Sequence, residues 1–224
     1  TSARAHVNYA TELQAAGRAD EAAKEFTEAI LLNPYSAKAL VTLGSLLMAK
    51  GELDKARSLF ALALRVEPRN AEYHSGYAYV LDQLGRMDDA AAECEMAIRL
   101  APKSPQAHYG YGAFLEKHGK PEEAIAKYRQ TLQYDANHVD ARIDLGNLLF
   151  ENGDTAEARE HFQKASALNP KLAQPHNYLG KVFMREGNVS QAIAQFEQAL
   201  RLHPDFPEAE ENLRIAKGTS AQSP

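Results

Sequence analysis

Apolar residues recur along the chain at the spacing of a helix, in pairs of blocks separated by a glycine. In the first block of one pair, Leu40 and Leu43 lie three residues apart, and in the second, Phe60 and Leu64 lie four apart. This spacing places the apolar side chains on one face of a helix. Gly51 stands between the blocks, and glycine ends helices because it adopts the left-handed conformation at little steric cost. The pattern predicts two helices joined by a tight turn.

The two-block pattern returns every 34 residues. The glycines between the blocks are Gly17, Gly51, Gly85, Gly119, Gly153 and Gly187. The residues that follow the second blocks are Pro34, Pro68, Pro102, Ala136, Pro170 and Pro204. Proline stops a helix, so these residues predict where each pair ends. We expect six repeats, each numbered from position 1, at residues 3–36, 37–70, 71–104, 105–138, 139–172 and 173–206.

Small and large residues are arranged so that the helix pairs can stack. Position 8 holds only Ala or Gly, except in the partial seventh copy described below, and position 24 holds an aromatic ring in every repeat except the third, where Cys94 stands. Small residues let two helices approach closely, and the rings fill the remaining space. One pair cannot bury both of its faces, so the pairs are expected to stack into a solenoid with a continuous core.

These positions, from residue 3 to residue 206 without a gap, resemble the tetratricopeptide repeat family. The resemblance implies an all-α, right-handed superhelical solenoid of antiparallel helix–turn–helix repeats, with the first helix of each repeat on the concave side. Residues 207–217 are expected to form a capping helix, because Arg214 at position 8 does not let a second helix approach. Residues 218–224 are expected to be a flexible tail. No such cap precedes residue 3, a hint that the natural chain continues upstream.

Charge and composition exclude several classes of function. The chain of 224 residues has 25 Lys and Arg against 30 Asp and Glu, a net charge of −5, so it lacks the basic excess that nucleic-acid binding requires. One cysteine excludes an internal disulfide framework. No apolar stretch approaches the roughly 18–20 residues of a membrane helix. We expect a soluble protein of unknown compartment, with the cytoplasm favoured over the periplasm.

No catalytic motif is found, and we expect no enzymatic activity, cofactor or metal. The histidines that share position 4 are His6, His74, His108 and His176. Equivalent residues of stacked repeats lie about one helix-packing layer apart, roughly 8–10 Å. That separation is too large for one ion with bonds of about 2.1 Å, so packing is favoured over ligation. Cys94 is expected to be a buried small side chain with a raised thiol pKa.

The site is expected on the concave face. Its candidate peptide-binding residues are Tyr79, Asp82, Tyr109, Glu116, Asp144, Asn147, Tyr178 and Lys181. Gly76 and Gly110 are expected to leave floor space beside Tyr79 and Tyr109, and phenol rings make good anchors. The apolar residues that favour a ligand over a merely solvated face are Val41, Met48, Ile143, Phe150 and Met184.

The leading interpretation is a non-enzymatic protein-interaction scaffold that binds a partner peptide or helix in its groove. The acidic, aromatic centre of the groove favours a segment with Lys or Arg beside an apolar residue. The residues of the chaperone-binding clamp found in some members of the family are absent here. Two alternatives remain open: a recognition arm of a larger enzyme such as a glycosyltransferase, and an assembly subunit that stacks end to end through its repeat-1 end.

Overall fold

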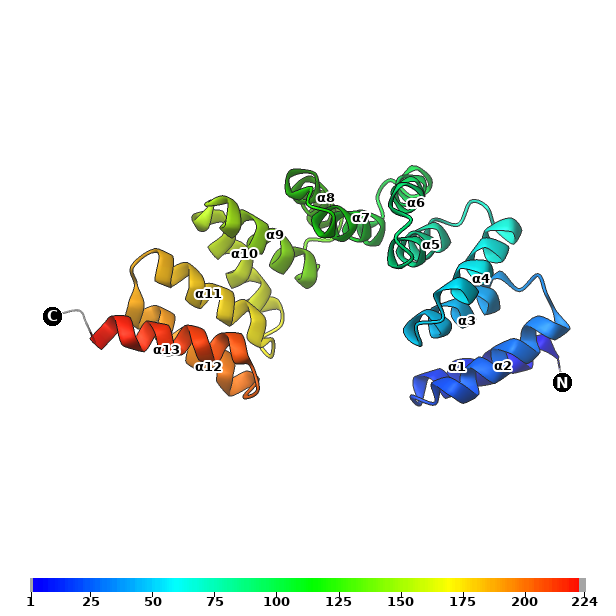
Figure 1. Cartoon of the computed structure of the whole chain (residues 1–224), viewed down its shortest axis with the longest axis horizontal. Helices are drawn as coiled ribbons and strands as arrows, with labels where there is room; N and C mark the ends of the chain where they lie inside the picture. The colour runs from blue at the N-terminus through cyan, green and yellow to red at the C-terminus, as the bar shows by residue number, and fades with distance from the viewer. Residues whose placement is uncertain (1, 222–224) are drawn as a thin grey trace. The chain divides into compact units, whose positions relative to one another are not determined.

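In the computed structural model, which describes residues 2–221, helices follow one another in pairs (Figure 1). The helices in the described residues are α1 (Ala3–Ala15), α2 (Ala19–Leu32), α3 (Ala37–Ala49), α4 (Leu53–Val66), α5 (Ala71–Gln83), α6 (Met87–Leu100), α7 (Pro105–Lys117), α8 (Pro121–Tyr134), α9 (Val139–Asn152), α10 (Thr155–Leu168), α11 (Ala173–Arg185), α12 (Val189–Leu202) and α13 (Pro207–Ala221). No strand occurs in residues 2–221. The chain is therefore all-α, and each of the six expected repeats contains one helix pair.

The chain divides into two compact units, Thr1–Phe114 and Leu115–Pro224, called unit 1 and unit 2 below. In unit 1, α3 packs against its partner α4 and also against α2 of the preceding pair. In unit 2, α11 packs against α12 and against α10 in the same way. Within each unit the helix pairs stack in sequence order, which is the arrangement expected of a solenoid.

The turns between paired helices depend on glycine. The six turn glycines have φ values between 70° and 94°, in the left-handed region, and no other residue type has a positive φ in the described part of the chain. This confirms the predicted turns, because a side chain with a Cβ is strained in this conformation. The turn amide nitrogens bond back to the ends of the first helices; the amide of Arg18, for example, lies 2.9 Å from the carbonyl of Leu13.

The core joins a small residue of one helix to a ring of the next. In unit 2, a Cβ added at Gly180 of α11 would lie 2.3 Å from the ring of Phe196 on α12, and that ring is 1% exposed. The same contact joins Gly146 to Phe162, where the distance would be 2.7 Å. The predicted pairing of positions 8 and 24 thus brings helix backbone directly against aromatic rings.

The last helix is longer than predicted. α13 runs from Pro207 to Ala221, so the first four residues of the expected flexible tail are helical, and residues 222–224 lie outside the described part of the chain. Ala216 is fully buried against α12, which anchors the helix close to its end. Arg214 pairs with Glu211 at 2.6 Å and keeps 74% of its side chain exposed, which fits the solvent-facing surface of a capping helix.

Candidate functional site

In unit 1, the predicted groove residues differ in exposure. Tyr79 on α5 is 55% exposed and Tyr109 on α7 is half-buried, so both rings can contact a partner. Asp82, by contrast, is only 8% exposed and lies near Cys94, whose thiol pKa it helps to raise. The expectation that Asp82 presents an acid to a peptide is therefore corrected: its side chain is buried close to Cys94 of α6.

The floor space expected beside the two tyrosines exists at only one of the two glycines. A Cβ at Gly76 would lie 2.5 Å from the ring of Phe60, so this ring occupies the space. A Cβ at Gly110 would meet nothing within 4 Å. Gly76 thus serves the packing of α5 against α4, and Gly110 alone leaves open surface next to Tyr109.

In unit 2, the predicted residues gather around Tyr178 of α11. Its ring stacks on the fully buried ring of Phe162 from α10, with centroids 4.8 Å apart and planes 8° from parallel. Burial raises the pKa of the Tyr178 phenol, a hydrogen bond with Gln174 lowers it in part, and the charges of Glu208, Asp144 and Glu151 add smaller upward effects. Three carboxylates, two on α9 and one on α13, therefore act electrostatically on one half-buried phenol.

Lys181 and Arg185, one and two turns further along α11, are both engaged. The ammonium of Lys181 lies 5.1 Å from the centre of the Tyr178 ring and 3.2 Å from a carboxylate oxygen of Glu208. The guanidinium of Arg185 lies 3.5 Å from the centre of the Phe150 ring and donates to the Phe150 carbonyl. We call Tyr178, Asp144, Glu151, Lys181 and Glu208 the Tyr178 cluster.

The remaining predicted polar residues of unit 2, Asn147 and Glu116, each form a side-chain hydrogen bond. The amide of Asn147 donates to Glu151 at 3.3 Å, and Glu116 accepts a hydrogen bond of 2.5 Å from the hydroxyl of the buried Tyr128. Two apolar residues expected in the groove are instead core, because Ile143 is 3% and Phe150 is 7% exposed. The unit-2 surface is thus more polar than the sequence indicated.

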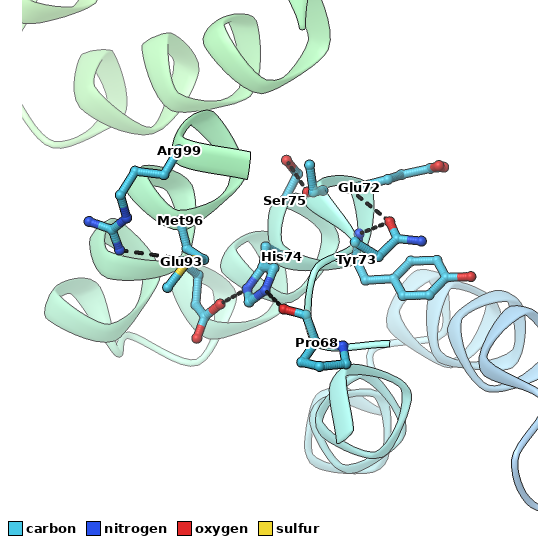
Figure 2. A network of polar contacts seen from close by, with 10 residues as sticks. Pro68, Glu72, Tyr73, His74, Ser75, Glu93, Met96 and Arg99 are labelled. Atoms are coloured by element: carbon cyan, nitrogen blue, oxygen red, sulfur yellow. Dashed lines mark hydrogen bonds and ion pairs between the residues drawn. The ribbon is translucent and has the colours of Figure 1, made fainter. Parts of the chain in front are cut away.

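The position-4 histidines make hydrogen bonds that the sequence analysis missed. Figure 2 shows the His74 ring between two elements: Nε2 lies 3.0 Å from the carbonyl oxygen of Pro68, and Nδ1 lies 2.5 Å from Glu93 of α6. His108 bonds the carbonyl of Pro102 in the same way at 2.9 Å. Position 4 therefore ties each of these repeats to the last turn of the repeat before it. The predicted packing is confirmed, since His74 and His108 are 8% and 3% exposed.

In the fifth repeat, Arg142 takes position 4 and His161 faces it from position 23. Arg142 donates to the carbonyl of Ala136, which preserves the tie to the preceding repeat. Arg142 Nε and His161 Nδ1 are both enclosed without a hydrogen-bond partner. Burial lowers the pKa of His161, and the charge of Arg142 lowers it further, against a smaller opposing effect of Glu157, 3.8 Å from Nε2.

Unit 2 is therefore expected to lose stability in mild acid. Because the pKa of His161 is lowered in the fold, the unfolded chain binds a proton more readily below about pH 6.5, and the free energy of unfolding falls as pH drops from there. Chemical denaturation should show that the free energy of unfolding falls less between pH 7.5 and pH 5 in His161→Leu than in the parent. The exposed His203 provides a matched control, His203→Leu, which should keep the parental pH dependence. Equal pH dependence in all three would contradict the assignment.

Among the described residues, no group of three His, Cys, Asp or Glu side chains could hold a metal ion. In the same part of the chain, none of the helices has the combined length and apolar character that crossing a membrane requires.

Comparisons with known proteins agree with this architecture. Profiles of the tetratricopeptide repeat match residues 10–65, 41–105, 93–126, 115–182 and 173–206. No curated protein matches the chain.

Solved structures are similar in fold. The APC/C hetero-tetramer Cut9–Hcn1 matches with a TM-score of 0.83 and 17% identity over 96% of this chain, which spans 43% of that one. The type IV pilus biogenesis factor PilW matches with a TM-score of 0.83 and 21% identity, over 94% of this chain and 98% of PilW. YrrB, described as a TPR protein with an unusual peptide-binding site, matches with a TM-score of 0.64 and 24% identity, over 84% of this chain and 97% of YrrB.

Proposed function

The chain belongs to the tetratricopeptide repeat family, and we propose that it is a protein-interaction scaffold that holds a segment of a partner protein against the Tyr178 cluster. The observation that carries the proposal is the half-buried ring of Tyr178, which stacks on Phe162 at 4.8 Å and lies 5.1 Å below the ammonium of Lys181, itself paired with Glu208. A tyrosine ring offers a large contact area with few rotors, which suits an anchor for a peptide. The peptide-binding site named for YrrB is consistent with such a role on the same fold.

The charges of the cluster favour a partner segment with Lys or Arg beside an apolar residue. The two cations of α11 are already engaged, Lys181 by Glu208 and Arg185 by Phe150. Three carboxylates, those of Asp144, Glu151 and Glu208, act on Tyr178, against these two cations, so the local excess of negative charge sets the sign of the field that an incoming segment meets there. Basic groups gain from this field, and acidic segments are repelled.

Removing the two carboxylates should weaken capture of the partner. We expect Asp144→Asn/Glu151→Gln to bind the partner from a source lysate about tenfold more weakly than the parent, a loss of about 1.4 kcal/mol. Quantitative pull-down followed by fluorescence anisotropy with the identified segment measures this change. The control Glu122→Gln/Glu160→Gln removes the same charge from exposed positions of unit 2 and should bind like the parent. Equal binding by both double variants would overturn the proposal.

The other expectations for binding stay predictions. Tyr79 and Tyr109 are accessible enough for unit 1 to contact a partner segment on its own. Self-association through the repeat-1 end stays a prediction as well. A recognition arm of a larger enzyme would use the same site to bind that enzyme's substrate. The neighbouring coding sequence distinguishes such an arm from a separate scaffold protein.

A further inference from the structure

We propose that a pocket beside the Tyr178 cluster, between the first residues of α11 and α13, is the subsite for an aromatic or large aliphatic side chain of the partner, with Lys or Arg next to it in sequence. This inference rests on the proposed function and specifies what the partner segment must contain. The pocket lies wholly within unit 2 and has a volume of about 460 Å³. Its size falls in the range of small ligand pockets, about 300–1,000 Å³.

The walls of the pocket are largely apolar. Leu172, Ala173, Leu202 and Phe206 line it together with the ring of Tyr178. All five are only partly buried, so their apolar surface remains accessible. The pocket therefore adjoins the Tyr178 cluster through Tyr178 itself, and a single short segment can contact both.

The residues at position 34 support the inference that this apolar surface binds a ligand. Position 34 precedes the first helix of the next repeat, where a polar side chain normally caps the free amide groups. Asn70 accepts from the amides of Glu72 and Tyr73, at 3.2 and 3.3 Å. Ser104 and His138 cap the amides three residues after them, each at 3.2 Å. At the first four junctions this position is polar, and three of the four residues cap; Ser36 before α3 makes no side-chain cap.

The last two junctions depart from this pattern, and both departures line the pocket. Position 34 is Leu172 before α11 and Phe206 before α13. Leu172 forms no side-chain cap, which forgoes about 1 kcal/mol of helix stability. Local rules that are broken together at one place indicate a functional surface. We infer that these two apolar residues are present to contact a ligand.

The charge at the rim indicates the neighbour of the apolar side chain. Glu208 lines the pocket, as does the exposed Lys171, and Glu208 keeps 51% of its side chain exposed while it pairs with Lys181. Asp144 and Glu151 of α9 act on the same phenol. A cation that follows the buried side chain by one or two residues can reach these carboxylates, which complement its charge.

The test restores the missing cap. A displayed library of random ten-residue peptides is selected on the immobilised chain, and the enriched peptides are measured by anisotropy on the parent and on Leu172→Asn. We expect the enriched peptides to pair an aromatic or large aliphatic residue with Lys or Arg, and to bind Leu172→Asn at least tenfold more weakly. We also expect the stability of Leu172→Asn to equal or exceed that of the parent, because Asn caps α11 as Asn70 caps α5.

Two matched variants sharpen the result. Glu208→Gln should weaken binding of the enriched peptides, whereas Glu210→Gln, an equally exposed acid of α13 outside the pocket, should not. Peptides that lose affinity for Asp144→Asn/Glu151→Gln but bind Leu172→Asn normally would overturn the pocket and leave the proposed function standing. No enrichment, or peptides indifferent to every variant, would overturn both. A large loss of stability in Leu172→Asn would show that Leu172 serves packing alone and would also overturn the pocket.

Discussion

Gly180→Ala is expected to destabilise unit 2 by about 1–3 kcal/mol, although alanine is normally the better helix former. The new Cβ would lie 2.3 Å from the Phe196 ring, closer than two carbon atoms can approach. The ring cannot move aside easily, because it is 1% exposed and packs with Ala192 and Ala216 in one core cluster. Denaturant unfolding should therefore show a lower midpoint with little change in slope.

Gly110→Ala provides the matched control. Gly110 also lies within a helix, but a Cβ there meets nothing within 4 Å. This variant should be neutral or more stable by up to about 1 kcal/mol, since it gains only helix propensity. Shortening the opposing ring in Gly180→Ala/Phe196→Leu should recover part of the loss. Equal effects of the two glycine substitutions, or no recovery in the double variant, would show that the contact is not the cause.

The helices and their turns could be predicted because they depend on local properties of the chain. Gly51 predicts its turn from local sequence alone, because the turn requires a left-handed residue and glycine adopts that conformation without strain. The pairing of Gly180 with Phe196 follows from the same 34-residue register. The end of α13 was less predictable, because Gly218 within a helix looks like a stop signal, yet buried Ala216 holds the segment against α12.

The site was predicted less completely because exposure depends on how each helix is rotated against its neighbours. Successive residues of a helix point about 100° apart, so a small rotation decides whether a side chain faces solvent or core. Asp82 and Phe150 were both expected on the groove surface, yet both are buried. Tyr178, Asp144 and Lys181 do come together, because α9 and α11 of successive repeats are in contact.

Some contacts between residues far apart in the sequence have a sequence pattern that can be interpreted only with the structure. The change from polar to apolar residues at position 34 is visible once the repeats are aligned. That Leu172 and Phe206 line one pocket depends on α11 and α13 beginning side by side, which sequence spacing does not state. The hydrogen bonds from His74 to Pro68 and from Arg142 to Ala136 could not be predicted either. In both, the acceptor is a backbone carbonyl, which every residue type carries.

Cys94 is expected to be almost inert towards thiol reagents in the folded chain. Burial raises the pKa of its thiol to about 12 from an ordinary value of 9.0, and the nearby charge of Asp82 adds to the effect. At pH 8 the reactive thiolate is then about 1,000-fold scarcer than for an exposed cysteine. Labelling with 5,5′-dithiobis(2-nitrobenzoate) should be at least about 100-fold slower in buffer than in denaturant.

The same measurement tests the corrected position of Asp82. Asp82→Asn removes a like charge beside the thiol, so the labelling rate of the folded chain should rise, by less than unfolding raises it because burial is the larger cause. Glu72→Gln removes a charge from an exposed position of the same helix and should leave the rate unchanged. If Asp82 instead faced solvent, as the sequence had indicated, both variants would label like the parent. A fast reaction of the folded parent would contradict the burial of Cys94 itself, and with it the packing of α5 on α6 that removes Asp82 from the binding surface.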